Sequence, residues 1–207
     1  MKFTSNDIKN LDKVYRLNLI NSITGIKPAN LIVTRSKDEV DNVAIFSSVV
    51  HLGSNPAMIG FVMRPQSNIN SDTYQNILDT KCYTINHITE KIYKKAHMTS
   101  GKTDQSEFDI LDIDKESCDF RVPFIKRSPV QIGMKLLKTI DLPNKCIFII
   151  GEPKIIIIND KIITSEGKIN LSSGNIVGLS GLDGYYNLNY LDSLEYVRNL
   201  NDINLDE

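Results

Sequence analysis

The chain has 207 residues, of which 41% are hydrophobic and 24% are charged, and its formal net charge is −1. This composition suits one packed core rather than a disordered segment, so we expect a single domain over residues 1–207. Without a basic excess we expect neither nucleic acid nor an anionic membrane as a partner, and no run approaches the roughly 18 apolar residues of a membrane span.

The first part of the chain predicts two helices with strands between them. Apolar positions between residues 9 and 22 recur at helical spacing, interrupted at Asn18, and Gly25 and Pro28 end this stretch. Ser71 and the two residues after it have the chemistry of a helix N-cap. We therefore expect a helix at residues 9–22, strands at 29–34, 43–51 and 57–63, a charged turn at 35–41, a turn at 53–56 and a helix from 71 to about 78.

The second part of the chain is rich in predicted strands. We expect a strand at residues 81–86, a helix at 88–100 that Gly101 stops, and a loop with a short helical piece at 105–113. A strand-rich region should follow at 129–158. After it we expect a turn with a polar connection at 165–171, a loop at 181–186 and a short terminal helix at 190–200. Because so many dispersed strands would expose many edges, we expect a closed antiparallel barrel with a few short helices packed outside it.

The cysteines and the N-terminus bear on the compartment. Cys82, Cys118 and Cys146 are widely spaced and odd in number, which argues against a disulfide framework or a zinc site and favours a reduced, cytoplasmic chain. The first seven residues lack the apolar core of a signal peptide, so we expect no secretion.

One polar group of residues indicates a site for an anion. Arg64 ends a predicted strand, and Ser71, Asp72 and Thr73 open a predicted helix a short loop later. The first amides of a helix lack internal partners and carry partial positive charge, which suits a phosphate, and Arg64 could add a charged contact. The carboxylate of Asp72 would oppose a phosphate unless it pointed away. The alternative is an ordinary N-cap with a solvated Arg64.

Two adjacent hydroxyls lie in an apolar strand. Ser47 and Ser48 must face opposite sides of that strand, so one can bond backbone while the other, or its amide, meets a ligand. Asn42, at the start of the strand, offers both a donor and an acceptor. The alternative is that both are ordinary strand serines with backbone partners.

The histidines give no sign of a metal site. His51, His87 and His97 are far apart in the sequence, and nothing around any of them marks a tuned imidazole. We also find no nucleophilic triad, no dinucleotide fingerprint and no phosphate-loop lysine motif, so no catalytic residue is assigned.

Several motifs in order carry a family resemblance. They are the strand with "DNVAIFSS" before its turn, "RPQSNINSDTYQNI", "CYTINHI", "AHMTSGKTDQSEFDI" and the later "GEPKIIIINDKII" and "GLDGYY". Their order and spacing resemble the flavin reductase-like family, the FMN-binding split barrels, and within it the flavoredoxin-like branch.

The resemblance implies a six-stranded antiparallel Greek-key split barrel, mainly β with short peripheral helices, that forms a homodimer and binds FMN near the subunit interface. The resemblance implies three groups of cofactor residues. The flavin ring and ribityl chain would be lined by Asn42, Ala44, Phe46, Ser47 and Ser48. The phosphate end would be formed by Arg64, Ser71, Asp72 and Thr73, with Asn76 nearby, and the cofactor would be approached by Asn86, His87 and the helix end from Ala96 to Gly101, with His97 and Ser100. Ser71 departs from the family, since many relatives have lysine there, and the residues from Gly25 to Pro28 keep only Lys27 and Pro28 of a common Pro-Arg-Pro.

The activity that the resemblance implies is that of an FMN oxidoreductase. NAD(P)H would give hydride to the flavin, which would pass electrons to free flavin, a small quinone or nitro compound, or a carrier protein. His87 and His97 are the candidates for shaping the nicotinamide side. Two alternatives stay open: an FMN-binding electron carrier or sensor with little NAD(P)H turnover, and a barrel that has lost its cofactor and serves as an interaction module.

Overall fold

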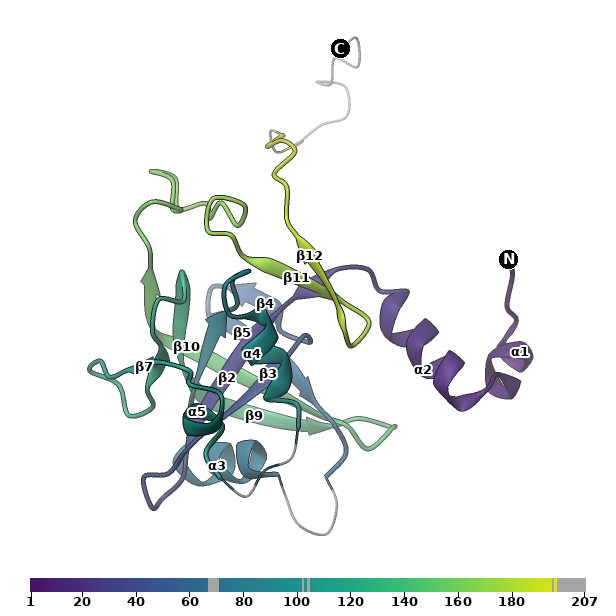
Figure 1. The fold of residues 1–207 in the computed structure, drawn as a ribbon, viewed down its shortest axis with the longest axis horizontal. Helices are drawn as coiled ribbons and strands as arrows, with labels where there is room; N and C mark the ends of the chain where they lie inside the picture. Colours follow the sequence, from purple (N-terminus) through teal and green to yellow (C-terminus); the bar gives the residue numbers. More distant parts are fainter. Residues whose placement is uncertain (67–70, 102, 104, 195, 197–207) are drawn as a thin grey trace.

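A seven-stranded antiparallel sheet forms the centre of the fold (Figure 1). The computed structural model describes residues 1–66, 71–101, 103, 105–194 and 196. The strands of this sheet, in the order β3-β2-β6-β9-β10-β5-β4, are β2 (Asn30–Arg35), β3 (Asp41–Phe46), β4 (Val50–Ser54), β5 (Ala57–Met63), β6 (Cys82–His87), β9 (Val130–Asp141) and β10 (Ile147–Ile158). The prediction of a mainly β fold with short peripheral helices is confirmed.

Smaller elements surround the central sheet. A three-stranded sheet contains β1 (Lys27–Pro28), β11 (Val177–Ser180) and β12 (Gly184–Asn187), and a two-stranded one contains β7 (Lys115–Glu116) and β8 (Phe124–Ile125). The helices are α1 (Ser5–Asn10), α2 (Lys13–Ser22), α3 (Asp72–Thr80), α4 (Tyr93–Met98) and α5 (Glu107–Ile110).

Alternation along the strands builds a core on each face of the sheet. On β2, Ile32 packs into one cluster with Phe61 and Tyr83, whereas its neighbours Leu31 and Val33 pack into the other. Successive side chains of a strand point to opposite faces, so one short apolar run serves both cores. The first cluster fills the inside of the curved sheet. The second lies outside it, where Ala96 of α4 and Phe108 of α5 cover β2 and β3.

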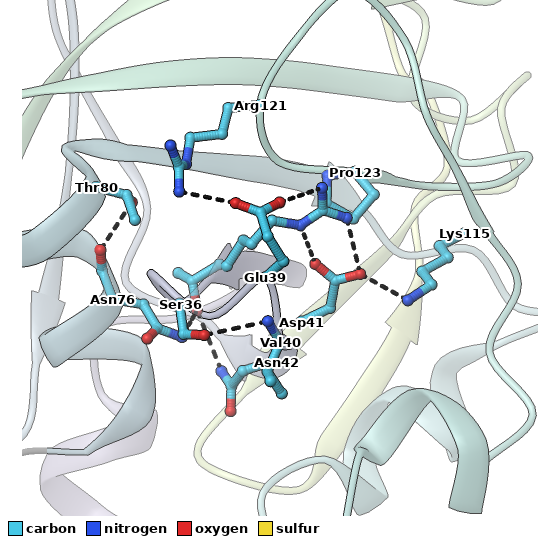
Figure 2. A network of polar contacts seen from close by, with 12 residues as sticks. Ser36, Glu39, Val40, Asp41, Asn42, Asn76, Thr80, Lys115, Arg121 and Pro123 are labelled. Carbon is cyan, nitrogen blue, oxygen red and sulfur yellow. Dashed lines mark hydrogen bonds and ion pairs between the residues drawn. The ribbon is translucent and has the colours of Figure 1, made fainter.

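A charged network holds the covering segment against the start of β3 (Figure 2). The buried carboxylate of Asp41 accepts hydrogen bonds from Arg35 Nε at 2.6 Å and from Lys115 Nζ at 2.6 Å. Burial alone would raise the pKa of Asp41, but these two cations hold it below its usual value. Arg121 adds an ion pair with Glu39 at 3.0 Å. The segment that carries α5, β7 and β8 is thereby tied to the β2–β3 turn.

The predicted helix at residues 9–22 is wrong in its boundaries. The chain forms α1 and α2 instead, with a break at Leu11 and Asp12. The break arises because the Asp12 carboxylate caps α2 by accepting from the N–H groups of Val14 and Tyr15, at 2.8 and 3.1 Å.

The predicted single strand at 43–51 is also wrong. It is divided into β3, which ends at Phe46, and β4, which begins at Val50. Between them the Ser48 hydroxyl both donates to the carbonyl of Val62 and accepts from its N–H, each at 3.0 Å, so the chain leaves one strand to pair with another. Because of this division the sheet has seven strands rather than six. Gly53 and Ser54 belong to β4, not to the predicted turn.

Three later predictions need correction. The helix at 88–100 is confined to α4, because Ile88 and Thr89 pair with the chain at β11. The loop at 181–186 is a turn whose end belongs to β12. Of the terminal helix at 190–200, residues 190–194 and 196 are not helical, and the remainder lies outside the described residues. Within the described part of the chain, no helix is long and apolar enough to cross a membrane.

Candidate functional site

The N-terminus of α3 is the first part of the candidate site. Ser71 caps this nine-residue helix with extended backbone, and its hydroxyl accepts from the N–H of Tyr74 at 3.4 Å. Asp72 and Thr73 follow as the first helical residues, so their N–H groups have no acceptor within the helix. Together with the helix dipole they make this end a place for an anion. Asp72 is exposed here, and its carboxylate opposes an anion.

A buried cluster of hydroxyls and amides joins this helix to β3. The Asn42 amide donates to the Thr73 hydroxyl at 2.9 Å and to the Thr34 hydroxyl at 3.4 Å. Asn76, one turn further along α3, donates to the same Thr34 hydroxyl at 3.1 Å, and Figure 2 shows both amides. The cluster fixes the helix start beside the first residues of β3, so the structure brings Asn42, Thr73 and Asn76 together.

Arg64 lies near the same helix start because of Gln66. The Gln66 side chain donates to the Arg64 carbonyl at 2.7 Å and accepts from the Ser71 N–H at 2.8 Å. One amide therefore spans the end of β5 and the cap of α3. The side chain of Arg64 is exposed at this point. Nothing in the sequence singles out Gln66, since its role depends on the folded loop.

The two adjacent serines have different surroundings. Ser48 is engaged by the backbone of Val62, as described above. Ser47 is half-buried and makes no side-chain hydrogen bond among the residues that the structure describes. One serine thus bonds backbone, and the other keeps its hydroxyl available at the end of β3.

Ala44 and Phe46 on β3 face the inside of the sheet. Ala44 is opposite Ile32, and Phe46 packs edge-on against Phe61 with ring centroids 5.1 Å apart. Their side chains therefore belong to the inner core. Since β3 is at the edge of the central sheet, a ligand along this strand would meet main-chain groups rather than these side chains.

Glu107, which the sequence prediction missed as a site residue, lies against that same edge. Burial raises the pKa of its carboxyl and the charge of Asp72 adds to the effect, while the Val43 N–H opposes it. The carboxyl group is therefore close to both the edge of β3 and the start of α3. The sequence signal was present, because Glu107 belongs to the Ser-Glu-Phe stretch already associated with the family.

Asn86 and His87 end β6 in different environments. Asn86 is fully buried, donates to the Leu31 carbonyl and the Thr84 hydroxyl, and accepts from the Ile125 N–H at 3.0 Å. Its amide therefore serves the protein itself. His87 has a buried Nδ1 without a hydrogen-bond partner in the described structure, and burial lowers its pKa to about 4.

Asn30 shares the surroundings of His87. It pairs across β2 and β6 with His87 and is fully buried, and both polar atoms of its side chain are also without partners in the described structure. Since residues directly opposite one another share a face, these unpartnered groups lie together at the end of the sheet away from α3.

His97 and Ser100 lie at the end of α4. His97 Nδ1 is 3.2 Å from the Tyr185 hydroxyl, and the two rings meet edge-on at 5.8 Å. Ser100 donates to the His97 carbonyl at 2.8 Å. Burial, helped by the charge of Asp183, raises the pKa of Tyr185 to about 12, so its hydroxyl stays protonated at neutral pH.

A surface hollow lies beside this pair and not at α3. It has a volume of about 470 Å³ and is lined by Glu90, Lys91, Tyr93, Val177, Tyr185, Tyr186 and Asn187. None of the predicted cofactor residues is in this lining. The α3 end is the better candidate for the cofactor site, because hydrogen-bond donors from separate elements converge there.

Comparisons with known proteins identify the family and the fold. The model of a family described as the flavin reductase like domain matches residues 26–162. A candidate flavin reductase with a split barrel domain from Shewanella frigidimarina NCIMB 400 is 38% identical, with a TM-score of 0.90 over 95% of this chain and 100% of that one. Nitrilotriacetate monooxygenase component B from Bacillus cereus is 17% identical, with a TM-score of 0.82 over 94% of this chain and 98% of that one. Flavoredoxin of Desulfovibrio vulgaris (Miyazaki F) is 16% identical, with a TM-score of 0.73 over 96% and 99%.

Proposed function

The chain belongs to the flavin reductase-like family, and from this premise we propose that it binds FMN and acts as an NAD(P)H-dependent oxidoreductase. Membership of the family implies a flavin cofactor. The choice of FMN, the nicotinamide donor and the acceptor are the parts that need argument and experiment.

The observation that carries the proposal is the junction of β3 with the start of α3. Asn42 and Thr73 are bonded at 2.9 Å, and Gln66 keeps Arg64 beside the Ser71 cap. This donor set suits one phosphate group: helix N–H groups, two hydroxyls and a guanidinium. A single phosphate at the end of a planar ring system describes FMN.

The residues of the chain would divide the work of binding. Ser71, Thr73 and Arg64 would hold the phosphate, and Asn42 would orient the Thr73 hydroxyl. From Asn42 to Phe46 the strand extends for about 13 Å at roughly 3.3 Å per residue, so the ring would lie toward Ser47. When bound, the flavin supplies the hydride and electron chemistry, which requires no acid or base from a side chain.

The predicted ring-side residues remain candidates of unequal strength. The Tyr185 hydroxyl, beside His97, could offer a neutral hydrogen-bond donor to a substrate at the end of α4. Asn86 and Ser48 are engaged by the protein, so we assign them to shaping the site rather than to contacting the cofactor. His87 would contact a ligand only as a neutral imidazole, because burial opposes its charge.

The partners and the compartment follow the same proposal. We propose a homodimer with NAD(P)H as donor and a small molecule or free flavin as acceptor. We also place the protein in the cytoplasm, and the free thiols of Cys82, Cys118 and Cys146 support that placement.

Anaerobic reduction tests this function. The protein, reconstituted with FMN, is mixed with NADH or NADPH while the visible flavin absorbance is followed, with protein-free FMN as the control. Rapid bleaching by either nucleotide supports the reductase. Bleaching by dithionite alone would overturn it in favour of an electron carrier, and failure to retain FMN would reject the cofactor itself.

A further inference from the structure

The N-terminal arm, defined here as α1 and α2, extends away from the rest of the molecule (Figure 1). Neither of its helices contains a buried residue. Val14, Leu17 and Ile20, spaced three residues apart along α2, are 62%, 48% and 43% exposed. Three aliphatic side chains therefore line one side of an arm that its own barrel does not cover.

Helices of this length need a partner surface. α1 has six residues and α2 has ten, whereas isolated helices shorter than roughly 12–15 residues are marginal in water. Both have side-chain caps, from Thr4 with Asp7 and from Asp12. Caps satisfy the first N–H groups but cover no apolar side chain, so tertiary packing has to supply the rest.

The root of the arm is fixed to the barrel. Lys27 Nζ donates to the carbonyl of Asn21 at 2.7 Å and to the hydroxyl of Thr24 at 3.0 Å. Lys27 also pairs with Leu179 of β11. These contacts tie the end of α2 to the three-stranded sheet.

The exposed area is larger than that of a compact monomer of this mass. The chain has an accessible surface of 13884 Å², whereas a compact monomer of 23.4 kDa exposes about 9,700 Å². Only part of the excess can come from the arm. About a fifth of it would already supply the roughly 800 Å² per partner that a stable interface buries.

We propose that the N-terminal arm packs on a second copy of this chain. In a twofold dimer each arm covers the partner subunit, so one patch of three aliphatic side chains is buried twice. This inference rests on the proposed homodimer and is independent of the proposed flavin chemistry. It predicts that the arm, and not only the barrel, holds the dimer together.

Sedimentation of a matched pair of variants tests the arm. Leu17→Glu places a charge in the aliphatic stripe, and Ser22→Glu places the same charge on an exposed residue of α2 that lies roughly 140° around the helix from Leu17. We expect dimer dissociation to rise at least tenfold for Leu17→Glu, because a charge would be buried without a partner, and to change less than about twofold for Ser22→Glu. Thermal unfolding should show that both variants keep the barrel fold.

A monomeric wild-type protein at tens of micromolar would overturn the proposal. So would a wild-type dimer whose dissociation constant is the same in Leu17→Glu. Hydrogen exchange is a second, independent test. The amides of α2 should gain protection as protein concentration rises, because dimerisation would cover the helix. If these amides stay unprotected at every concentration, the proposal is contradicted. Binding of FMN by the same samples reports separately on the flavin site.

Discussion

The side-chain amide of Asn42 donates a hydrogen bond to the hydroxyl of Thr73 over 2.9 Å, which connects an edge strand to the start of a helix 31 residues later. Each element alone would be unremarkable as a ligand site. Their junction places strand, helix amides and the end of β5 around one point. The proposed phosphate site combines this junction with the charge of Arg64.

Removing the Thr73 hydroxyl should weaken FMN binding. Thr73→Val keeps the shape of the side chain but loses a donor to phosphate and leaves the Asn42 amide with its longer contact to Thr34. We expect a loss of about 1 kcal/mol, or roughly fivefold in affinity, measured by quenching of FMN fluorescence. Thr80→Val is the control, because the Thr80 hydroxyl bonds the Asn76 carbonyl at the far end of the same helix. Equal weakening in both variants would point to a general effect on α3.

Neutralising Asp41 should destabilise the fold. Its side chain is 4% exposed and is bonded to Arg35 and Lys115. Asp41→Asn leaves both cations without their carboxylate, so we expect a loss of about 2–3 kcal/mol in the free energy of unfolding by urea. Asp38→Asn, an exposed position in the same turn, should change it by less than about 0.5 kcal/mol. A loss no greater than that of Asp38→Asn would mean that the network contributes little to holding the α5 segment over β3.

Buried His87 should make the fold sensitive to acid. Because burial lowers its pKa to about 4 from 6.5, the unfolded chain binds the proton first as pH falls. Stability is therefore lost between about pH 6.5 and 4, at no more than about 1.4 kcal/mol per pH unit.

Urea unfolding across this pH range should show a shallower acid loss in His87→Gln than in the wild type. His51→Gln, on the exposed β4, is the control. If His87→Gln loses stability with falling pH as steeply as the wild type does, then His87 takes up protons in the folded state. The buried polar groups of His87 and Asn30 would in that case be open to water.

Local chemistry explains what the sequence could predict. Ser71 was identifiable as a cap because N-cap preference depends on one residue and its immediate neighbours. Short apolar runs bounded by turn residues marked β2 and β6 as strands for the same reason. Membership of the family followed from the order of several weak motifs, each of which is local. The flavoredoxin-like branch stays a prediction.

Long-range contacts explain what the sequence could not predict. The run from 43 to 51 reads as one strand, and its division depends on Ser48 meeting Val62, 14 residues away. Gln66 acquires its role only when the folded loop brings Arg64 and Ser71 within reach of one amide. The exposed side of α2 likewise shows only once the rest of the apolar residues have been placed in the two cores.

The affinities for FMN and riboflavin test the central claim most directly. The two ligands share a ring and ribityl chain and differ only in the phosphate, so their ratio isolates the α3 site. We expect the wild type to bind FMN at least tenfold more tightly than riboflavin. Arg64→Ala should lose about 1.5–3 kcal/mol of FMN affinity with little change for riboflavin, while Arg121→Ala should alter neither. Equal affinities for the two flavins in the wild type, or an Arg64→Ala variant with unchanged FMN affinity, would contradict a phosphate held where α3 begins.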